Sequence, residues 1–122
     1  MSIGGEAVDA TRAAELYGGQ NGCTEKIVLK AARERRVIAV RDGNGQWHFP
    51  VWQFNAHGKT LPGISEIVRI LRKRRSCDDL SVVAFFVNPS SALNGRAPYE
   101  FLREKRRATV STVKKLAEAE AE

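Results

Sequence analysis

Residues 24–54 constrain the fold more than any other part of the chain, because two hydrophobic periods follow each other there directly. The first period is helical, with apolar side chains at Ile27, Val28, Ala31 and Ala32. The second is that of short strands, whose strand-forming residues are Ile38, Val40, Trp47 and Phe49. Between the strands, Gly43-Asn44-Gly45 supplies the positive φ that a tight turn needs. The sequence therefore predicts a helix followed at once by a β-hairpin.

The predicted helix has basic side chains on the side opposite its apolar stripe. Residues 24–41 contain six basic and two acidic side chains. Lysine and arginine pair with phosphates, and arginine can form a bidentate contact with guanine. A helix of this kind could enter the major groove while the hairpin contacts the backbone or minor groove beside it. The alternative is a solvated helix face. The candidate DNA-binding residues are Thr24, Lys26, Lys30, Arg33, Arg35, Arg36, Arg41 and Asn44.

Short signals predict where the N-terminal helices begin and end. Thr24 can cap the basic helix, and Glu25 in its first turn suits the helix dipole. Upstream, Thr11 can cap a short helix over 12–17 that Gly18-Gly19 would end. We expect residues 1–9 to be a flexible tail and 10–57 to be the DNA-binding unit.

The second half of the chain is predicted to be helical. Ile64, Ile67, Val68 and Leu71 share one helix face. Asp78 and Asp79 open a second helix that Pro89 stops, and its predicted inward residues are Leu80, Val83, Ala84 and Val87. Pro98 suits a first helical position, and a last helix runs over about 109–117. We expect 58–117 to form a helical partner-binding or dimerisation unit and 118–122 to be an acidic tail.

Composition narrows the classes of function. A chain of 122 residues allows one compact domain, or two small units that share a core. The formal charge of +6 favours a polyanionic partner, and no apolar run approaches the ~20 residues that span a bilayer. Cys23 and Cys77 lack metal-ligand spacing, which fits thiols in a reducing cytoplasm. We expect no membrane association.

An enzyme is not expected from the motifs. Gly43-Asn44-Gly45 lacks the Gly-Lys-Ser/Thr ending of a phosphate-binding loop. His48 and His57 have no carboxylate or cysteine at useful spacing, and Cys23 has no evident base. The sequence therefore predicts no catalytic residue, no cofactor and no metal. A cluster of aromatic residues could stack on single-stranded bases, but packing of the hairpin on the helices is favoured for Trp47, Phe49, Trp52 and Phe54.

The first half resembles small bacterial winged helix-turn-helix DNA-binding proteins. The resemblance rests on Ala39-Val40-Arg41 and Trp47-His48-Phe49-Pro50, which match the two strands of the wing. It implies a mainly α fold with a small β-hairpin, a winged helix-turn-helix followed by a C-terminal helical bundle. The segment from Gly18 to Thr24 is longer than the usual connection, so the start of the recognition helix stays open.

The second half resembles the toxin-binding domain of Xre/MbcA/ParS-type antitoxins. The matching segments are Leu61-Pro62-Gly63, Phe85-Phe86-Val87-Asn88-Pro89, Leu93-Asn94-Gly95-Arg96-Ala97-Pro98 and Phe101-Leu102. The resemblance implies a toxin partner of the RES type, which attacks NAD. Such antitoxins usually bind DNA through an Xre-type domain, and the whole chain is also similar to mycobacterial winged-helix regulators. The implied partner-binding residues are Asn88, Leu93, Gly95, Arg96, Pro98 and Leu102.

These lines together predict a cytoplasmic, homodimeric DNA-binding transcription regulator. As the antitoxin of a type II toxin–antitoxin system, it would be a repressor of its own operon and would neutralise a RES-type toxin. A winged-helix regulator without a toxin partner is the alternative. A third class is an interaction module whose charge is incidental.

Overall fold

The computed structural model describes residues 7–17, 24–55, 58–73, 78–104 and 107–121. Within these ranges the chain is mainly helical with a small antiparallel sheet, as predicted. The helices are α1 (Ala10–Leu16), α2 (Glu25–Arg33), α3 (Ile64–Leu71), α4 (Asp79–Val87), α5 (Pro98–Leu102) and α6 (Arg107–Ala121). The strands are β1 (Ala7–Val8), β2 (Val40–Arg41) and β3 (Trp47–Pro50), and single 3-10 turns follow at Val51–Gln53 and Ser91–Leu93. The predictions for Cys23, His57 and Cys77 concern residues outside these ranges.

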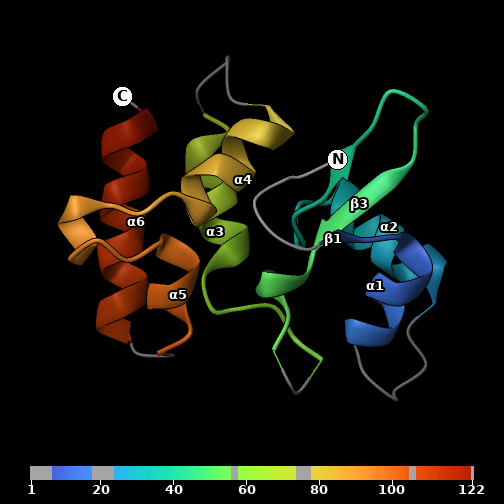
Figure 1. The fold of residues 1–122 in the computed structure, drawn as a ribbon, viewed down its shortest axis with the longest axis horizontal. Coiled ribbons are helices and arrows are strands. Elements are labelled where there is room, and N and C mark those ends of the chain that lie inside the picture. Colours follow the sequence, from blue (N-terminus) through green and yellow to red (C-terminus); the bar gives the residue numbers. More distant parts are fainter. Residues whose placement is uncertain (1–6, 18–23, 56–57, 74–77, 105–106, 122) are drawn as a thin grey trace.

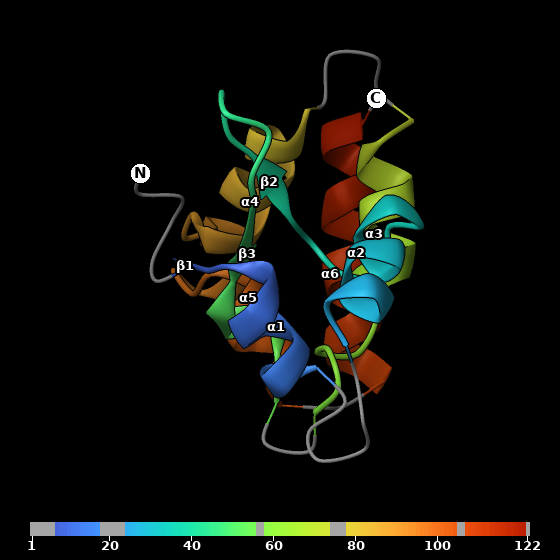
Figure 2. The same ribbon diagram turned by 90° about the vertical axis from the view of Figure 1, so that its right-hand side faces the viewer.

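The elements form two groups joined by the sheet (Figure 1). Helices α1 and α2 pack together beside the sheet, and α3, α4, α5 and α6 form a bundle on its other side. Turned by a quarter, the molecule has α2, α3 and α6 on one side, with the sheet, α4 and α5 on the other (Figure 2). The arrangement places the predicted basic helix α2 and the bundle helices α3 and α6 along one side.

The sheet has the strand order β1-β3-β2, with all pairs antiparallel. Ala7 pairs with Pro50, and Val8 pairs with Phe49. The prediction of a tail over 1–9 is therefore wrong for 7–9, because a two-residue strand was too short to show a period. The Asp9 carboxylate accepts a hydrogen bond from the Arg12 amide at 3.0 Å and caps α1. Helix α1 thus begins at Ala10, with Asp9 and not Thr11 as its cap.

Two hydrophobic cores meet at the segment that leads into β2. Its residues alternate between the cores, since successive side chains of extended chain point to opposite faces. Val37 and Ala39 pack in the N-terminal core, with Ala13, Ala14, Val28, Ala31 and Phe49. Ile38 and Val40 pack in the larger core of the bundle. The hairpin that was assigned to residues 10–57 therefore also completes the core of the unit that follows.

A buried glutamine fixes the same segment in place. Gln53 donates hydrogen bonds to the carbonyls of Ile38 at 2.6 Å and Pro50 at 3.0 Å, and its own carbonyl accepts from the Ile38 amide at 2.6 Å. The side chain is fully buried, so each of these bonds replaces one that water would otherwise provide. The loop before β2 is thereby tied to the turn after β3.

The bundle confirms the predicted positions of its helices and corrects some of their inward faces. The four predicted residues of α3 are all buried. In α4 the buried residues are Val82, Val83, Phe85 and Phe86, whereas Leu80 is 51% exposed because it lies in the first turn, outside the bundle. Helix α6 continues to Ala121, so Glu118 and Glu120 lie on a helix and not in a tail. Gly63 starts α3 at φ +80°, in close contact with Val110 of α6.

Candidate nucleic-acid interface

Helix α2 begins where its sequence predicts. The Thr24 hydroxyl accepts a hydrogen bond from the Ile27 amide at 3.4 Å, and Glu25 lies in the first turn. Only Val28 and Ala31 of this helix are buried, because a helix packed on one neighbour needs a narrow apolar stripe. The prediction that Ile27 faces the core is wrong, since its side chain is 46% exposed. An apolar side chain therefore stands in the solvent-facing first turn of α2.

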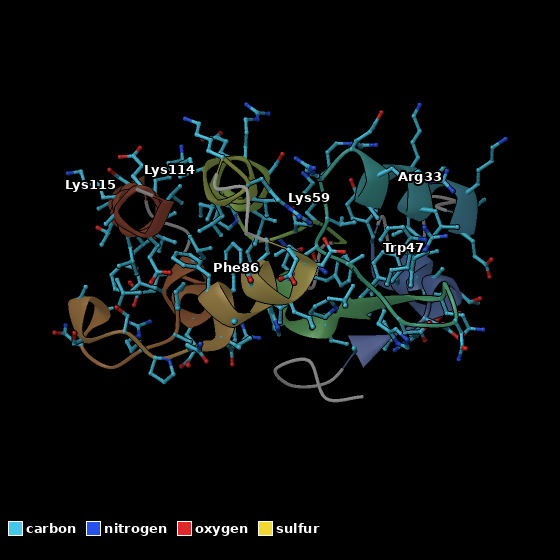
Figure 3. The ribbon with its side chains drawn as sticks, turned by 90° about the horizontal axis from the view of Figure 1, so that it is seen from above. Arg33, Trp47, Lys59, Phe86, Lys114 and Lys115 are labelled. Atoms are coloured by element: carbon cyan, nitrogen blue, oxygen red, sulfur yellow. The ribbon has the colours of Figure 1, made fainter. Side chains whose placement is uncertain are left out.

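A stripe of cations occupies the outer face of α2. Lys26, Lys30 and Arg33 are spaced four and three residues apart, which places them on one side of the helix, and all three are exposed. Figure 3 shows Arg33 on the edge of the molecule formed by α2. Among the residues that the structure describes, none of these three has a hydrogen bond or ion pair through its side chain. We call them the α2 stripe.

The end of α2 separates two predicted DNA-binding arginines. The Arg36 amide donates to the Ala31 carbonyl at 2.9 Å and the Arg35 amide to the Ala32 carbonyl at 3.1 Å, which is the hydrogen-bond pattern of a Schellman cap. Arg35 has φ 61° and takes the left-handed position that glycine usually fills. The Arg36 guanidinium pairs with Glu34 at 2.7 Å. Arg36 is thus partly neutralised, whereas Arg35 is exposed and outside any salt bridge in the described chain.

The hairpin turn between β2 and β3 is organised by one carboxylate. Asp42 accepts hydrogen bonds from the amides of Asn44 at 2.8 Å and Gln46 at 3.0 Å, and its second oxygen lies 2.8 Å from His48 Nε2. These bonds, that from His48 first, hold the pKa of Asp42 below its ordinary value. Gly45 has φ +79°, as the predicted turn requires. The turn presents Asn44 to solvent at its tip.

Arg41 lies along the hairpin and not at its tip. Its Nε donates to the Gly45 carbonyl at 3.3 Å, and its guanidinium lies 5.4 Å from the centre of the Trp47 ring. The other aromatic residues of the hairpin region pack inside: Phe49 and Trp52 are buried, and Trp52 stacks at 5.4 Å on Phe86. Core packing, rather than base stacking, is the observed role of Phe49 and Trp52.

A hollow of about 170 Å³ lies between the end of α2, the hairpin, the end of α3 and the start of α4. Its wall includes Arg33 and Arg35 from the end of α2, Trp47 from β3, and Arg72 and Asp79 from the bundle. Arg72 and Asp79 form an ion pair across it. Three guanidinium groups and one carboxylate therefore surround a small concave surface, which leaves it net positive.

The predicted partner-binding residues divide into two kinds. Leu93, Pro98 and Leu102 are buried, so as direct contacts these three are wrong; their apolar side chains complete the bundle core instead. Asn88 and Gly95 are exposed. Gly95 has φ +80°, a left-handed conformation that glycine adopts without steric cost.

Arg96 is held on the surface of the same loop. It pairs with Glu104, and its guanidinium lies 5.1 Å from the centre of the Phe101 ring. A second hollow, of about 520 Å³, separates this loop and α4 from α6, with Asn88, Pro89 and Ser90 in its wall. The surface members of the predicted partner site thus lie around one polar loop.

Among the described residues no group of three or more histidine, cysteine, aspartate or glutamate side chains could hold a metal ion. No helix in the described ranges is long and apolar enough to cross a membrane. Comparison of the sequence with protein-family models and curated proteins, and of the structure with solved structures, finds no significant match.

Proposed function

We propose that this chain is a cytoplasmic DNA-binding transcription regulator that inserts α2 into the major groove of duplex DNA. The observation that supports this most is the α2 stripe, three exposed cations on one helix face without partners in the described chain. A folded protein gains little from aligned, unpaired like charges, because they repel one another. Phosphates on both sides of a major groove would relieve that repulsion.

The order of the elements supports a winged helix-turn-helix interpretation. Two packed helices, α1 and α2, precede the β2–β3 hairpin, and β1 completes the sheet on the far side of β3. With α2 as the recognition helix, the hairpin is the wing, and Asn44 at its exposed tip is placed to contact the sugar-phosphate backbone. Thr24 and Lys26 lie at the N-terminal end of α2, the end that contacts base edges in such proteins.

Ile27 is the residue of α2 best suited to read a base. It is 46% exposed in the first turn, directly after Lys26 of the α2 stripe. Apolar side chains distinguish thymine by contact with its C5 methyl group. We therefore expect Ile27 to prefer thymine at one position of the site.

The test compares two charge-matched double variants on duplex DNA selected from a random library. Lys30→Gln with Arg33→Gln removes two cations of the α2 stripe, whereas Arg12→Gln with Arg103→Gln removes two cations outside α2, α3 and α6. The first should reduce the slope of log affinity against log salt by about 1.8, at about 0.9 per phosphate contact, and the second should leave it unchanged. Equal slopes for both variants and the natural chain would refute DNA binding through α2.

The same library tests dimerisation. One recognition helix covers only a few base pairs, and a two-fold dimer doubles the site, so we propose a homodimer that binds inverted repeats. Selected sequences without an inverted repeat, together with a monomeric mass by light scattering with and without DNA, would contradict it.

We further propose that the bundle binds a protein, a RES-type toxin, and that the chain is its antitoxin and the repressor of their shared operon. The surface around Asn88, Gly95 and Arg96, beside the 520 Å³ hollow, is the site proposed for it. The full-length chain should co-purify with the product of the adjacent gene and restore growth of cells that express it. Gly95→Val should weaken this association and leave DNA binding intact, because its turn lies away from α2. If neither association nor rescue is found, the alternative of a regulator without a toxin stands.

A further inference from the structure

Helices α2, α3 and α6 lie side by side along one face of the molecule (Figures 2 and 3). We call their solvent side the basic face. The helices on the opposite side, α4 and α5, contain no lysine or arginine. The described cations next to α5 are Arg96, which pairs with Glu104, and Arg103, which lies over the Tyr99 ring, so the unpaired cations of α3 and α6 lie on the basic face.

Helix α3 repeats on a smaller scale what α2 does. Its four apolar residues point into the core, and this leaves Arg69 and Lys73 exposed four residues apart, at and just beyond its last turn. Neither forms a salt bridge with another described residue. The pKa of Glu66 on the same helix is lowered mainly by Lys114 and least by Arg69, which acts on that carboxyl only through space, so both cations stay open to an external anion.

The arginine-lined hollow joins α2 to α3. Arg33 and Arg35 reach it from the end of α2, and Arg72 reaches it from the end of α3. Because Arg72 pairs with Asp79, the free charge of the hollow comes from the α2 side. The one described carboxylate of the hollow, that of Asp79, is paired with Arg72, so a surplus of cations continues from the α2 stripe to the exposed cations of α3.

Helix α6 sets the far limit of the face. Lys115 is exposed, and Lys114 pairs with Glu66 of α3, which holds the pKa of Glu66 below its ordinary value. Figure 3 shows both lysines on α6 at the edge away from Arg33. Beyond them Glu118 and Glu120 make the last turns of α6 acidic. The charges would therefore attract a polyanion over the surface from α2 to Lys115 and repel it at the acidic end of α6.

We propose that the C-terminal bundle itself binds duplex DNA, with Arg69 and Lys73 on phosphates that flank the segment occupied by α2, and Lys115 on the outermost ones. The inference rests on the proposed function of α2 and extends it to the half of the chain assigned to protein binding. Charge complementarity selects the partner, since phosphates supply most of the affinity in protein–DNA contacts. DNA that crosses the basic face would then be contacted by both halves of one chain.

The experiment uses the full-length chain and two duplexes that share one half-site of the selected inverted repeat. One has about 10 base pairs, one helical turn, and the other extends about ten base pairs further on each side. Arg69→Gln with Lys73→Gln should reduce the salt slope on the longer duplex by about 1.8 and leave it unchanged on the shorter one. The charge-matched Arg12→Gln with Arg103→Gln variant should match the natural chain on both, and thermal unfolding confirms that each variant is folded.

The outcomes separate this inference from the proposed function. We call Lys30→Gln with Arg33→Gln the α2 variant and Arg69→Gln with Lys73→Gln the α3 variant. If the α2 variant has a reduced salt slope on both duplexes and the α3 variant keeps the natural slope on the longer one, DNA binding through α2 stands and the contribution of the bundle is refuted. If the α2 variant also loses none, both proposals fail. A loss by the α3 variant that is equal on the two duplexes would also overturn the inference, because it would not come from flanking phosphates.

Discussion

Replacement of Arg35 by glycine should stabilise the fold while it weakens DNA binding. Arg35 has φ 61° at the left-handed end of α2. An L residue in this conformation is strained by about 1–2 kcal/mol, and glycine is not. Against this, glycine loses about 0.5–1 kcal/mol more conformational entropy on folding. The net gain is about 0.5–1 kcal/mol. For a chain of this size that should raise the melting temperature by roughly 2–5 °C.

The matched control is Arg33→Gly, two residues earlier. Arg33 is the last residue of α2, in a helical conformation, where glycine costs up to about 1 kcal/mol. The two variants have the same composition, and both remove a guanidinium from the same hollow. We therefore expect opposite changes in melting temperature, measured by circular dichroism, and a similar loss of about 0.9 in the salt slope of DNA binding.

Two results would refute the reasoning. If Arg35→Gly melts no higher than the natural chain, the left-handed position is not strained by its arginine. If it melts higher but keeps its DNA affinity and salt slope, Arg35 does not contact phosphate, and the strain serves no DNA-binding role.

Three further predictions follow from the core, the turns and the hairpin. Gln53→Glu should destabilise the fold by about 3 kcal/mol in urea titration, because a carboxylate would face the Ile38 carbonyl and could not donate to it; an unchanged midpoint would contradict the buried amide pairing. Gly63→Ala should lower the free energy of unfolding by about 2 kcal/mol and Gly95→Ala by about 1 kcal/mol, measured in the same titration. Both glycines have φ +80°, but only at Gly63 would an added Cβ lie 2.7 Å from a side-chain carbon. Equal losses of stability would show that this steric clash contributes nothing. The pKa of Asp42 is lower in the folded chain than its ordinary value of 3.8, so ionised Asp42 stabilises the hairpin fully above pH 3.8. This stabilisation is lost as the pH falls through the lower pKa of the folded chain. Tryptophan fluorescence of the hairpin should report the loss in the natural chain and not in Asp42→Asn.

The sequence predicted the helices better than their surroundings. Thr24, Asp78 and Pro98 marked the starts of α2, α4 and α5 correctly, because caps and proline act locally. Strand β1 was missed since two residues define no period, and only its pairing with β3 makes it a strand. The exposure of Ile27 was missed for a related reason: periodicity gives one face of a helix, and the neighbouring helix decides how much of that face is covered.

For the candidate site, the sequence shows which residues are basic, but it does not show which of them are exposed and free of salt bridges. The charge surplus of residues 24–41 is evident in the sequence, but the pairing of Arg36 with Glu34 depends on the turn that ends α2. Leu93 and Leu102 were assigned to a partner surface because their pattern was conspicuous, and they are buried because the same pattern builds the core. The basic residues over 69–75 are visible in the sequence too, but the position of α3 on the same side of the molecule as α2 depends on long-range packing.

The alternation of residues 37–40 between two cores has a consequence for engineering. A chain cut near residue 57 would leave Ile38 and Val40 facing water, so the DNA-binding half should not be obtainable as a stable excised fragment. The same geometry makes the two halves unsuitable as interchangeable parts: a graft of this hairpin onto a foreign bundle must also supply a cavity shaped for those two side chains. Any ligand that repacks the bundle would act on the hairpin through them, which gives the molecule a mechanical link between its halves.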